Sequence, residues 1–142
     1  MSAVQISSLH NGPTISLPLF DYSVSAGTPS YVTGTVDRTI DLNRELVLNP
    51  HDSFCVRANG QSMVDAGIDN GDLLVVDKKI EPEDGRIVLA VVNGDFTVKR
   101  LIKRNGRVIL QPENEAFQPL EIDAYMDFRI WGVVTGVIKS FL

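Results

Sequence analysis

A serine and a lysine are the two side chains of this 142-residue chain whose types and surroundings best suit chemistry. Ser62 follows Gly60 and is expected to open a short helical turn, where unpaired backbone N–H groups could stabilise an oxyanion. A lysine removed from water loses its proton more readily, so a neutral Lys99 could accept the proton of the Ser62 hydroxyl. A Ser-Lys pair of this kind is a known variant of the catalytic triad. The chemistry it indicates is acyl transfer.

Each residue also has a simpler interpretation. Ser62 with Asp65 three positions later resembles a capping box, in which the hydroxyl only accepts a hydrogen bond from a helix amide. Lys99 could extend along apolar neighbours and keep its ammonium in water. His10 and His51 are poorer bases, since His10 lies in the N-terminal arm and His51 in an expected loop. Both interpretations stay open at this point.

The element expected to position the lysine is a β-hairpin. Asn93-Gly94 lies between two apolar stretches, residues 87–92 and 96–102, and this dipeptide favours a type I′ turn. A two-residue loop there places Lys99 opposite Val88. The lysine then shares one face of the sheet with Thr97 and Leu101.

The rest of the chain indicates an all-β fold. From Ser53 onward turn signals recur about every 10 residues, as in a sandwich or a partly open barrel. Asn105-Gly106 predicts a second hairpin, and Gly132 and Gly136 predict a bend or bulge in the last strand. A helical turn is expected only over residues 62–67.

Composition excludes several classes of protein. Lys and Arg total 13 against 18 Asp and Glu, a net charge of −5 that argues against a stand-alone nucleic-acid binder. One cysteine and two histidines are too few for the usual zinc sites, and we expect neither metal nor cofactor. Cys55 is expected in the core. No apolar run reaches the roughly 20 residues that span a bilayer, and no secretory signal is evident, so a cytoplasmic location is expected.

Several other segments of the chain are also informative. These are Asn59-Gly60-Gln61-Ser62-Met63, residues 71–77 and residues 94–100, together with residues 18–20, 40–43, 112–114 and 131–134. In this order they resemble the LexA/UmuD self-cleaving serine peptidase family, and most closely its UmuD-type mutagenesis proteins. Gly60-x-Ser62-Met63 matches the nucleophile segment of that family, and Lys99 matches its general base.

The resemblance implies a fold, a site and a cleaved bond. The fold would be the LexA/UmuD peptidase-like β-rich fold, with an extended N-terminal arm over residues 1–40, a core over residues 41–142 and one short helical turn at the nucleophile. Ser62 would be the nucleophile, Lys99 the base, and the backbone amides of Ser62 and Met63 the oxyanion site. The bond cut would be Ala26-Gly27, within Val24-Ser25-Ala26-Gly27-Thr28.

The resemblance also implies partners. A RecA–single-stranded-DNA filament would favour self-cleavage in the SOS response to DNA damage. The cut form would act as a homodimeric accessory subunit of an error-prone, UmuC-type Y-family polymerase in translesion synthesis. No membrane and no direct sequence-specific DNA binding are expected. The alternative is a non-enzymatic β-rich interaction module, in which Ser62 is a cap and Lys99 a surface charge.

Overall fold

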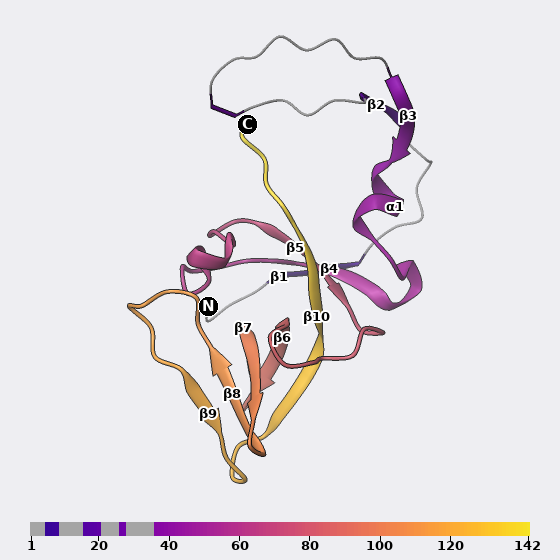
Figure 1. The fold of residues 1–142 in the computed structure, drawn as a ribbon. Helices are drawn as coiled ribbons and strands as arrows, with labels where there is room; N and C mark the ends of the chain where they lie inside the picture. The colour runs from indigo at the N-terminus through magenta and orange to yellow at the C-terminus, as the bar shows by residue number, and fades with distance from the viewer. Residues whose placement is uncertain (1–4, 9–15, 21–25, 28–35) are drawn as a thin grey trace. The chain divides into compact units, whose positions relative to one another are not determined.

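The computed structural model describes residues 5–8, 16–20, 26–27 and 36–142 (Figure 1). The chain divides into two compact units, one formed by residues 11–48 and the other by residues 1–10 with 49–142. The expected division into an arm over residues 1–40 and a core over residues 41–142 stays a prediction.

The larger unit is built on one antiparallel sheet. Within the described residues this sheet has eight strands in the order β1-β4-β5-β10-β6-β7-β8-β9 (Figure 1). Their bounds are β1 Gln5–Ser8, β4 Ser53–Arg57, β5 Leu73–Asp77, β6 Ile87–Val92, β7 Asp95–Arg104, β8 Arg107–Gln111, β9 Leu120–Ile122 and β10 Phe128–Ile138. The all-β prediction is confirmed.

Two tight hairpins join β6, β7 and β8 in the predicted register. Asn93 and Gly94 have φ angles of 49° and 86°, the left-handed values that a type I′ turn requires. The turn pairs Val88 with Lys99. Asn105-Gly106 forms the second turn with φ angles of 51° and 75°. These turns fix which face of the sheet Lys99 occupies.

Strand β10 pairs with two different neighbours along its length. Its first half pairs with β6 and its second half with β5, and Figure 1 shows it as the long yellow strand. The register shifts between Ile130 and Gly132, and again between Val134 and Gly136. Both shifts coincide with the glycines that predicted a bend.

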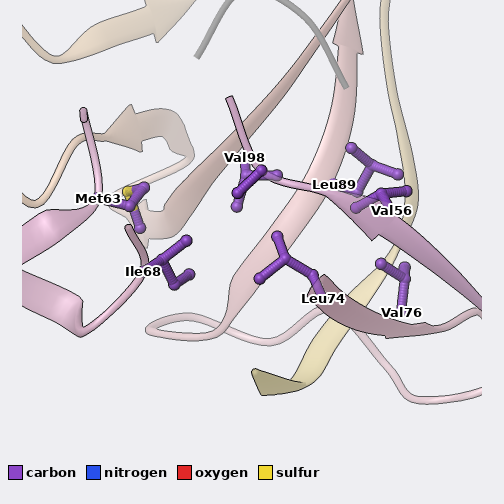
Figure 2. Close-up of a cluster of buried hydrophobic side chains, with 8 residues drawn as sticks. Val56, Met63, Ile68, Leu74, Val76, Leu89 and Val98 are labelled. Atoms are coloured by element: carbon purple, nitrogen blue, oxygen red, sulfur yellow. The ribbon is translucent and has the colours of Figure 1, made fainter. Parts of the chain in front are cut away.

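The hydrophobic core forms two clusters. Successive residues of β6 alternate between them: Leu89 belongs to the first cluster, and Val88 and Ala90 to the second. The first, drawn in Figure 2, contains Val56, Ala58, Met63, Ile68, Leu74, Val76, Leu89 and Val98. The second contains Val88, Ala90, Leu101, Leu110 and Val133. Cys55 is also buried, as expected, and burial raises the pKa of its thiol.

The smaller unit holds a two-stranded antiparallel sheet and a short helix. Strand β2 (Ser16–Phe20) pairs with β3 (Val36–Asp41), which leads directly into α1 (Leu42–Leu46). The Asp41 carboxylate accepts a hydrogen bond of 3.0 Å from the Asn43 amide and so caps the helix.

Helical turns are more numerous than the sequence predicted. Besides α1, a 3₁₀ turn η1 covers Pro50–Asp52, and both were missed because one turn is too short to show a helical period. The predicted turn near the serine is present as η2 (Val64–Ala66).

Candidate active site

The structure brings Ser62 and Lys99 together. Lys99 Nζ, from β7, lies 3.0 Å from Ser62 Oγ, which belongs to the loop between β4 and β5. Ser62 is fully buried and Lys99 is half-buried. The β6–β7 hairpin positions Lys99 and the loop after β4 positions Ser62, and a hydrogen bond joins the two side chains.

Two further acceptors surround the lysine ammonium. Nζ donates to Thr97 Oγ1 at 2.8 Å and to the Val98 carbonyl at 3.1 Å. A neutral amine has two N–H bonds and one lone pair. In its neutral form, with its two hydrogens on Thr97 and Val98, the amine would direct its lone pair toward the Ser62 hydroxyl. This geometry suits a base that receives the serine proton.

Burial shifts the protonation equilibrium of Lys99 toward the neutral amine. Removal from water disfavours the charged form and lowers the pKa of Lys99 below its usual value of 10.5. The alternative in which Lys99 extends into solvent is wrong, because its ammonium is held among three protein acceptors. Thr97 is a residue whose role the sequence analysis missed. Residues two apart on a strand share a face, so the position of Thr97 could have predicted its contact with Lys99.

Ser62 does not cap the helical turn that follows it. The N-cap of η2 is Met63, which makes no side-chain cap hydrogen bond. The Asp65 amide, which a capping box would satisfy, donates instead to the Glu113 carbonyl at 2.9 Å. The capping interpretation is therefore wrong, and the hydroxyl contacts the lysine.

The residue next to the serine anchors it to the core. Met63 is fully buried and, in Figure 2, points with Ile68 toward Val98 and Leu74. The Met63 carbonyl accepts hydrogen bonds from the amides of Ala66 at 3.1 Å and Ile68 at 3.2 Å. Burial of an apolar neighbour fixes the backbone from which the Ser62 hydroxyl projects.

Main-chain hydrogen bonds join the two ends of the loop that carries Ser62. The Ala58 amide donates to the Asp72 carbonyl at 2.7 Å, and the Gly71 amide donates to the Ala58 carbonyl at 2.8 Å. Within the loop, the Gly60 amide donates to Asn70 Oδ1 at 2.8 Å. The loop is thus a closed unit that starts and ends on adjacent strands.

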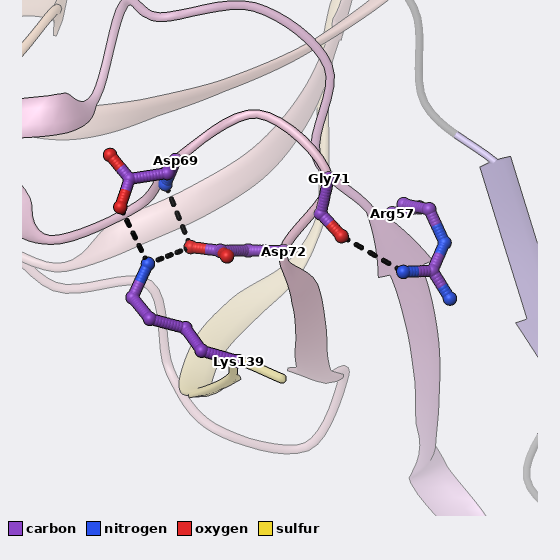
Figure 3. Close-up of polar contacts among 5 residues, drawn as sticks. All are labelled: Arg57, Asp69, Gly71, Asp72 and Lys139. Atoms are coloured by element: carbon purple, nitrogen blue, oxygen red, sulfur yellow. Dashed lines mark hydrogen bonds and ion pairs between the residues drawn. The ribbon is translucent and has the colours of Figure 1, made fainter. Parts of the chain in front are cut away.

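Side chains also hold together the two ends of the Ser62 loop (Figure 3). Arg57 Nη1 donates to the Gly71 carbonyl at 2.8 Å. Lys139, just beyond β10, pairs with Asp69 at 2.8 Å and also with Asp72. Asp72 Oδ2 in turn accepts the Asp69 amide at 2.7 Å. Hydrogen bonds to the carboxylates of Asp69 and Asp72 hold the pKa of Lys139 above its usual value.

A cavity of about 480 Å³ lies beside the lysine. Phe96, Leu110 and Leu120 supply apolar surface, and Asn93 and Gln118 supply hydrogen-bonding groups. Lys99 and Thr97 line the same cavity. A cavity whose lining mixes apolar side chains with hydrogen-bonding groups suits a short peptide segment.

The predicted cleavage site lies in a part of the chain that the structure describes only in part. Ala26 and Gly27 form an exposed bend in the smaller unit. Val24, Ser25 and Thr28 lie outside the described residues, as does His10. His51 lies in η1 and is exposed, and its side chain makes no hydrogen bond within the described part of the chain. The assignment of a cleaved bond stays a prediction.

Comparison with known proteins shows the family to which the chain belongs. Residues 18–135 match the peptidase S24-like family. The chain is 43% identical to Protein ImpA of Salmonella typhimurium over 123 residues, 85% of this chain and 82% of ImpA. It is 38% identical to the LexA repressor of Caldicellulosiruptor saccharolyticus over 125 residues, 88% of this chain and 59% of the repressor.

A second repressor is similar at the same level. The LexA repressor of Psychromonas ingrahamii is 40% identical over 125 residues, again 59% of its length. In the described part of the chain, no helix has the length and apolar character needed to cross a membrane. The family match covers both the Ser62 loop and the Lys99 strand. The chain belongs to the peptidase S24-like family, the LexA/UmuD group of self-cleaving serine peptidases.

Proposed function

We propose that this protein cuts its own chain between Ala26 and Gly27, with Ser62 as nucleophile and Lys99 as general base. The observation that supports this most directly is the 3.0 Å contact between Lys99 Nζ and Ser62 Oγ at a lysine whose pKa is lowered by burial. A nucleophile within hydrogen-bond reach of its base is the arrangement that covalent catalysis requires.

The reaction begins with proton transfer. Neutral Lys99 takes the hydroxyl proton of Ser62, and Oγ attacks the carbonyl carbon of Ala26. The resulting oxyanion is held by the backbone amides of Ser62 and Met63. Within the described part of the chain the Met63 amide makes no hydrogen bond, which supports this role.

The second half of the reaction returns the proton. The Lys99 ammonium protonates the Gly27 nitrogen as the Ala26–Gly27 bond breaks, which leaves an ester between Ser62 and Ala26. Water then hydrolyses the ester and regenerates the hydroxyl. Because substrate and enzyme share one chain, a high effective concentration compensates for slow chemistry.

The proposed biological role follows the relatives. Similarity to ImpA and to LexA repressors supports a role in the SOS response of a cytoplasmic protein. We infer that a RecA–single-stranded-DNA filament stimulates the cut. The cut form, residues 27–142, then serves as a homodimeric accessory subunit of a UmuC-type translesion polymerase.

One experiment separates this function from a non-enzymatic interaction module. The purified full chain, incubated at pH about 10 where more lysine is neutral, is expected to yield residues 1–26 and 27–142. Ser62→Ala and Lys99→Ala are expected to stay whole, while the control His51→Ala still cuts. Intact wild type both at this pH and with activated RecA filament would overturn the proposal. Loss of cutting in His51→Ala but not in Lys99→Ala would reassign the base.

The partner proposals have their own measurements. Addition of RecA filament at neutral pH is expected to increase the rate of cutting of wild type but not of Ser62→Ala. Sedimentation at micromolar concentration is expected to give a dimer, and a monomer would contradict that part. Co-purification of residues 27–142 with a UmuC-type polymerase tests the accessory role, and no association would reject it.

A further inference from the structure

Arg100, the residue after Lys99 in β7, makes the ion pair on which this inference rests. Its Nε donates to Glu113 Oε1 at 2.5 Å, and its Nη1 donates to the Gly85 carbonyl at 2.7 Å. Both side chains of the pair are largely buried, with 31% of Arg100 and 23% of Glu113 exposed. Partial burial and two anchored guanidinium nitrogens hold the pair in one geometry.

The backbone of Glu113 contacts the serine segment directly. The Glu113 amide donates to the Ser62 carbonyl at 2.8 Å, and the Glu113 carbonyl accepts the Asp65 amide at 2.9 Å. The neighbouring Asn114 side chain donates to the Gln61 carbonyl at 2.9 Å. Residues 113–114 therefore form hydrogen bonds with the main chain before, at and after Ser62.

These contacts connect the two halves of the site. One residue beyond Lys99, the Arg100 side chain holds the Glu113 side chain, and the Glu113 main chain holds Ser62. We propose that Arg100 and Glu113 are positioning residues that keep Ser62 Oγ within proton-transfer distance of Lys99 Nζ. The inference rests on the proposed Ser-Lys function and adds residues that touch neither the substrate nor the reacting atoms.

The same hairpin offers a matched control pair. Arg107 and Glu121 form an ion pair between β8 and β9, with Nη2–Oε2 at 2.6 Å. Their side chains are more exposed, at 60% and 49%, and neither makes a hydrogen bond to the Ser62 segment. A pair of the same types without that contact separates positioning from general stability.

The experiment measures the reactivity of the serine in two ways. The full chain and its Arg100→Gln, Glu113→Gln, Arg107→Gln and Glu121→Gln variants are compared for alkaline self-cleavage and for labelling by a small fluorophosphonate. In labelling, the Ser62 Oγ–phosphorus bond forms, fluoride leaves and Lys99 receives the hydroxyl proton. Labelling does not require the chain's own cleavage segment. Thermal melting checks that each variant is folded.

Loss of alignment is expected to slow both reactions together. Arg100→Gln and Glu113→Gln are expected to be about 10- to 100-fold slower in labelling and cutting, while both control variants match wild type. The charge-reversed double variant Arg100→Glu/Glu113→Arg restores the ion pair but not the hydrogen bond to the Gly85 carbonyl. It is therefore expected to cut and label faster than either single variant without reaching the wild-type rate.

The outcomes distinguish the two proposals. Wild-type rates of labelling and cutting in folded Arg100→Gln and Glu113→Gln would overturn the positioning role and leave the Ser-Lys function intact. An equal loss in the Arg107 and Glu121 controls would also overturn it. A wild-type protein that neither labels nor cuts would overturn the function itself, and the positioning role with it.

Discussion

At the scale of single residues, the proposed reaction requires Lys99 to be neutral when it accepts the Ser62 proton and charged when it protonates the leaving amine. Burial lowers its pKa and favours the neutral form. The acceptors Thr97 Oγ1 and the Val98 carbonyl remain available in both states. The site therefore accommodates both protonation states without rebuilding its hydrogen bonds.

The lowered pKa predicts the pH dependence of self-cleavage. The neutral fraction of Lys99 rises with pH, so the rate is expected to rise about tenfold per pH unit and to level off at the pKa. Because burial lowers that pKa, levelling is expected below pH 10.5. Fragment appearance between pH 6 and 11, at constant ionic strength and with Ser62→Ala as blank, measures it. A plateau that begins near pH 6.5 would instead indicate a histidine base.

Thr97 provides a second prediction at this scale. Thr97→Val keeps the shape of the side chain but removes an acceptor for Lys99 Nζ. The limiting rate is expected to fall about tenfold, the value of one hydrogen bond of ordinary strength. The plateau is expected at lower pH, because the ammonium loses an acceptor that stabilised its charge. Thr97→Ser, which retains the hydroxyl, should behave like wild type. An unchanged profile in Thr97→Val would show that the hydroxyl does not hold the amine.

At the scale of elements, β10 connects the strands on either side of it. It must pair with β5 and β6 in turn, and it shifts register at Gly132 and Gly136. The two glycines differ in what surrounds them. A Cβ at Gly132 would lie 2.6 Å from Val76 Cγ1 and 3.0 Å from the Asp77 carbonyl, whereas one at Gly136 would meet nothing within 4 Å.

This difference predicts opposite effects of one substitution. Gly132→Ala is expected to lower the free energy of unfolding by about 1–3 kcal/mol, because the buried Val76 cannot move away without cost. Gly136→Ala, whose φ is not positive, is expected to be neutral or to stabilise by up to about 1 kcal/mol. Denaturant unfolding at neutral pH in a Ser62→Ala background measures both. Equal effects would refute the close approach at Gly132.

Local signals in the sequence were sufficient for some of these elements. Asn93-Gly94 alone fixed the pairing of Lys99 with Val88, because a two-residue turn leaves a single register. The contact between Glu113 and Ser62 could not be predicted, since it joins main-chain groups of two loops and produces no periodic pattern in the sequence. Pairing of β1 with β4 was missed for a similar reason: strands distant in sequence pair without a turn between them.

At the scale of the whole molecule, two strand pairings join residues before the proposed cleavage site to residues after it. β1 and β2 both precede Ala26, and their partners β4 and β3 both follow Gly27. In the intact chain each pairing is intramolecular, which gives it an effective concentration in the millimolar range. Hydrolysis of one peptide bond turns both pairings into associations between separate molecules.

This change predicts that the cut releases the N-terminal fragment. β1 pairs through four residues, and β2 with β3 forms a two-stranded sheet, which is marginal in water. After cutting at high pH and return to neutral pH at micromolar concentration, residues 1–26 are expected to elute apart from residues 27–142. The β4 amides that pair with β1 are then expected to exchange their hydrogens faster than in intact Ser62→Ala carried through the same treatment. Co-elution of the fragment with unchanged exchange in β4 would show that β1 holds without its covalent connection.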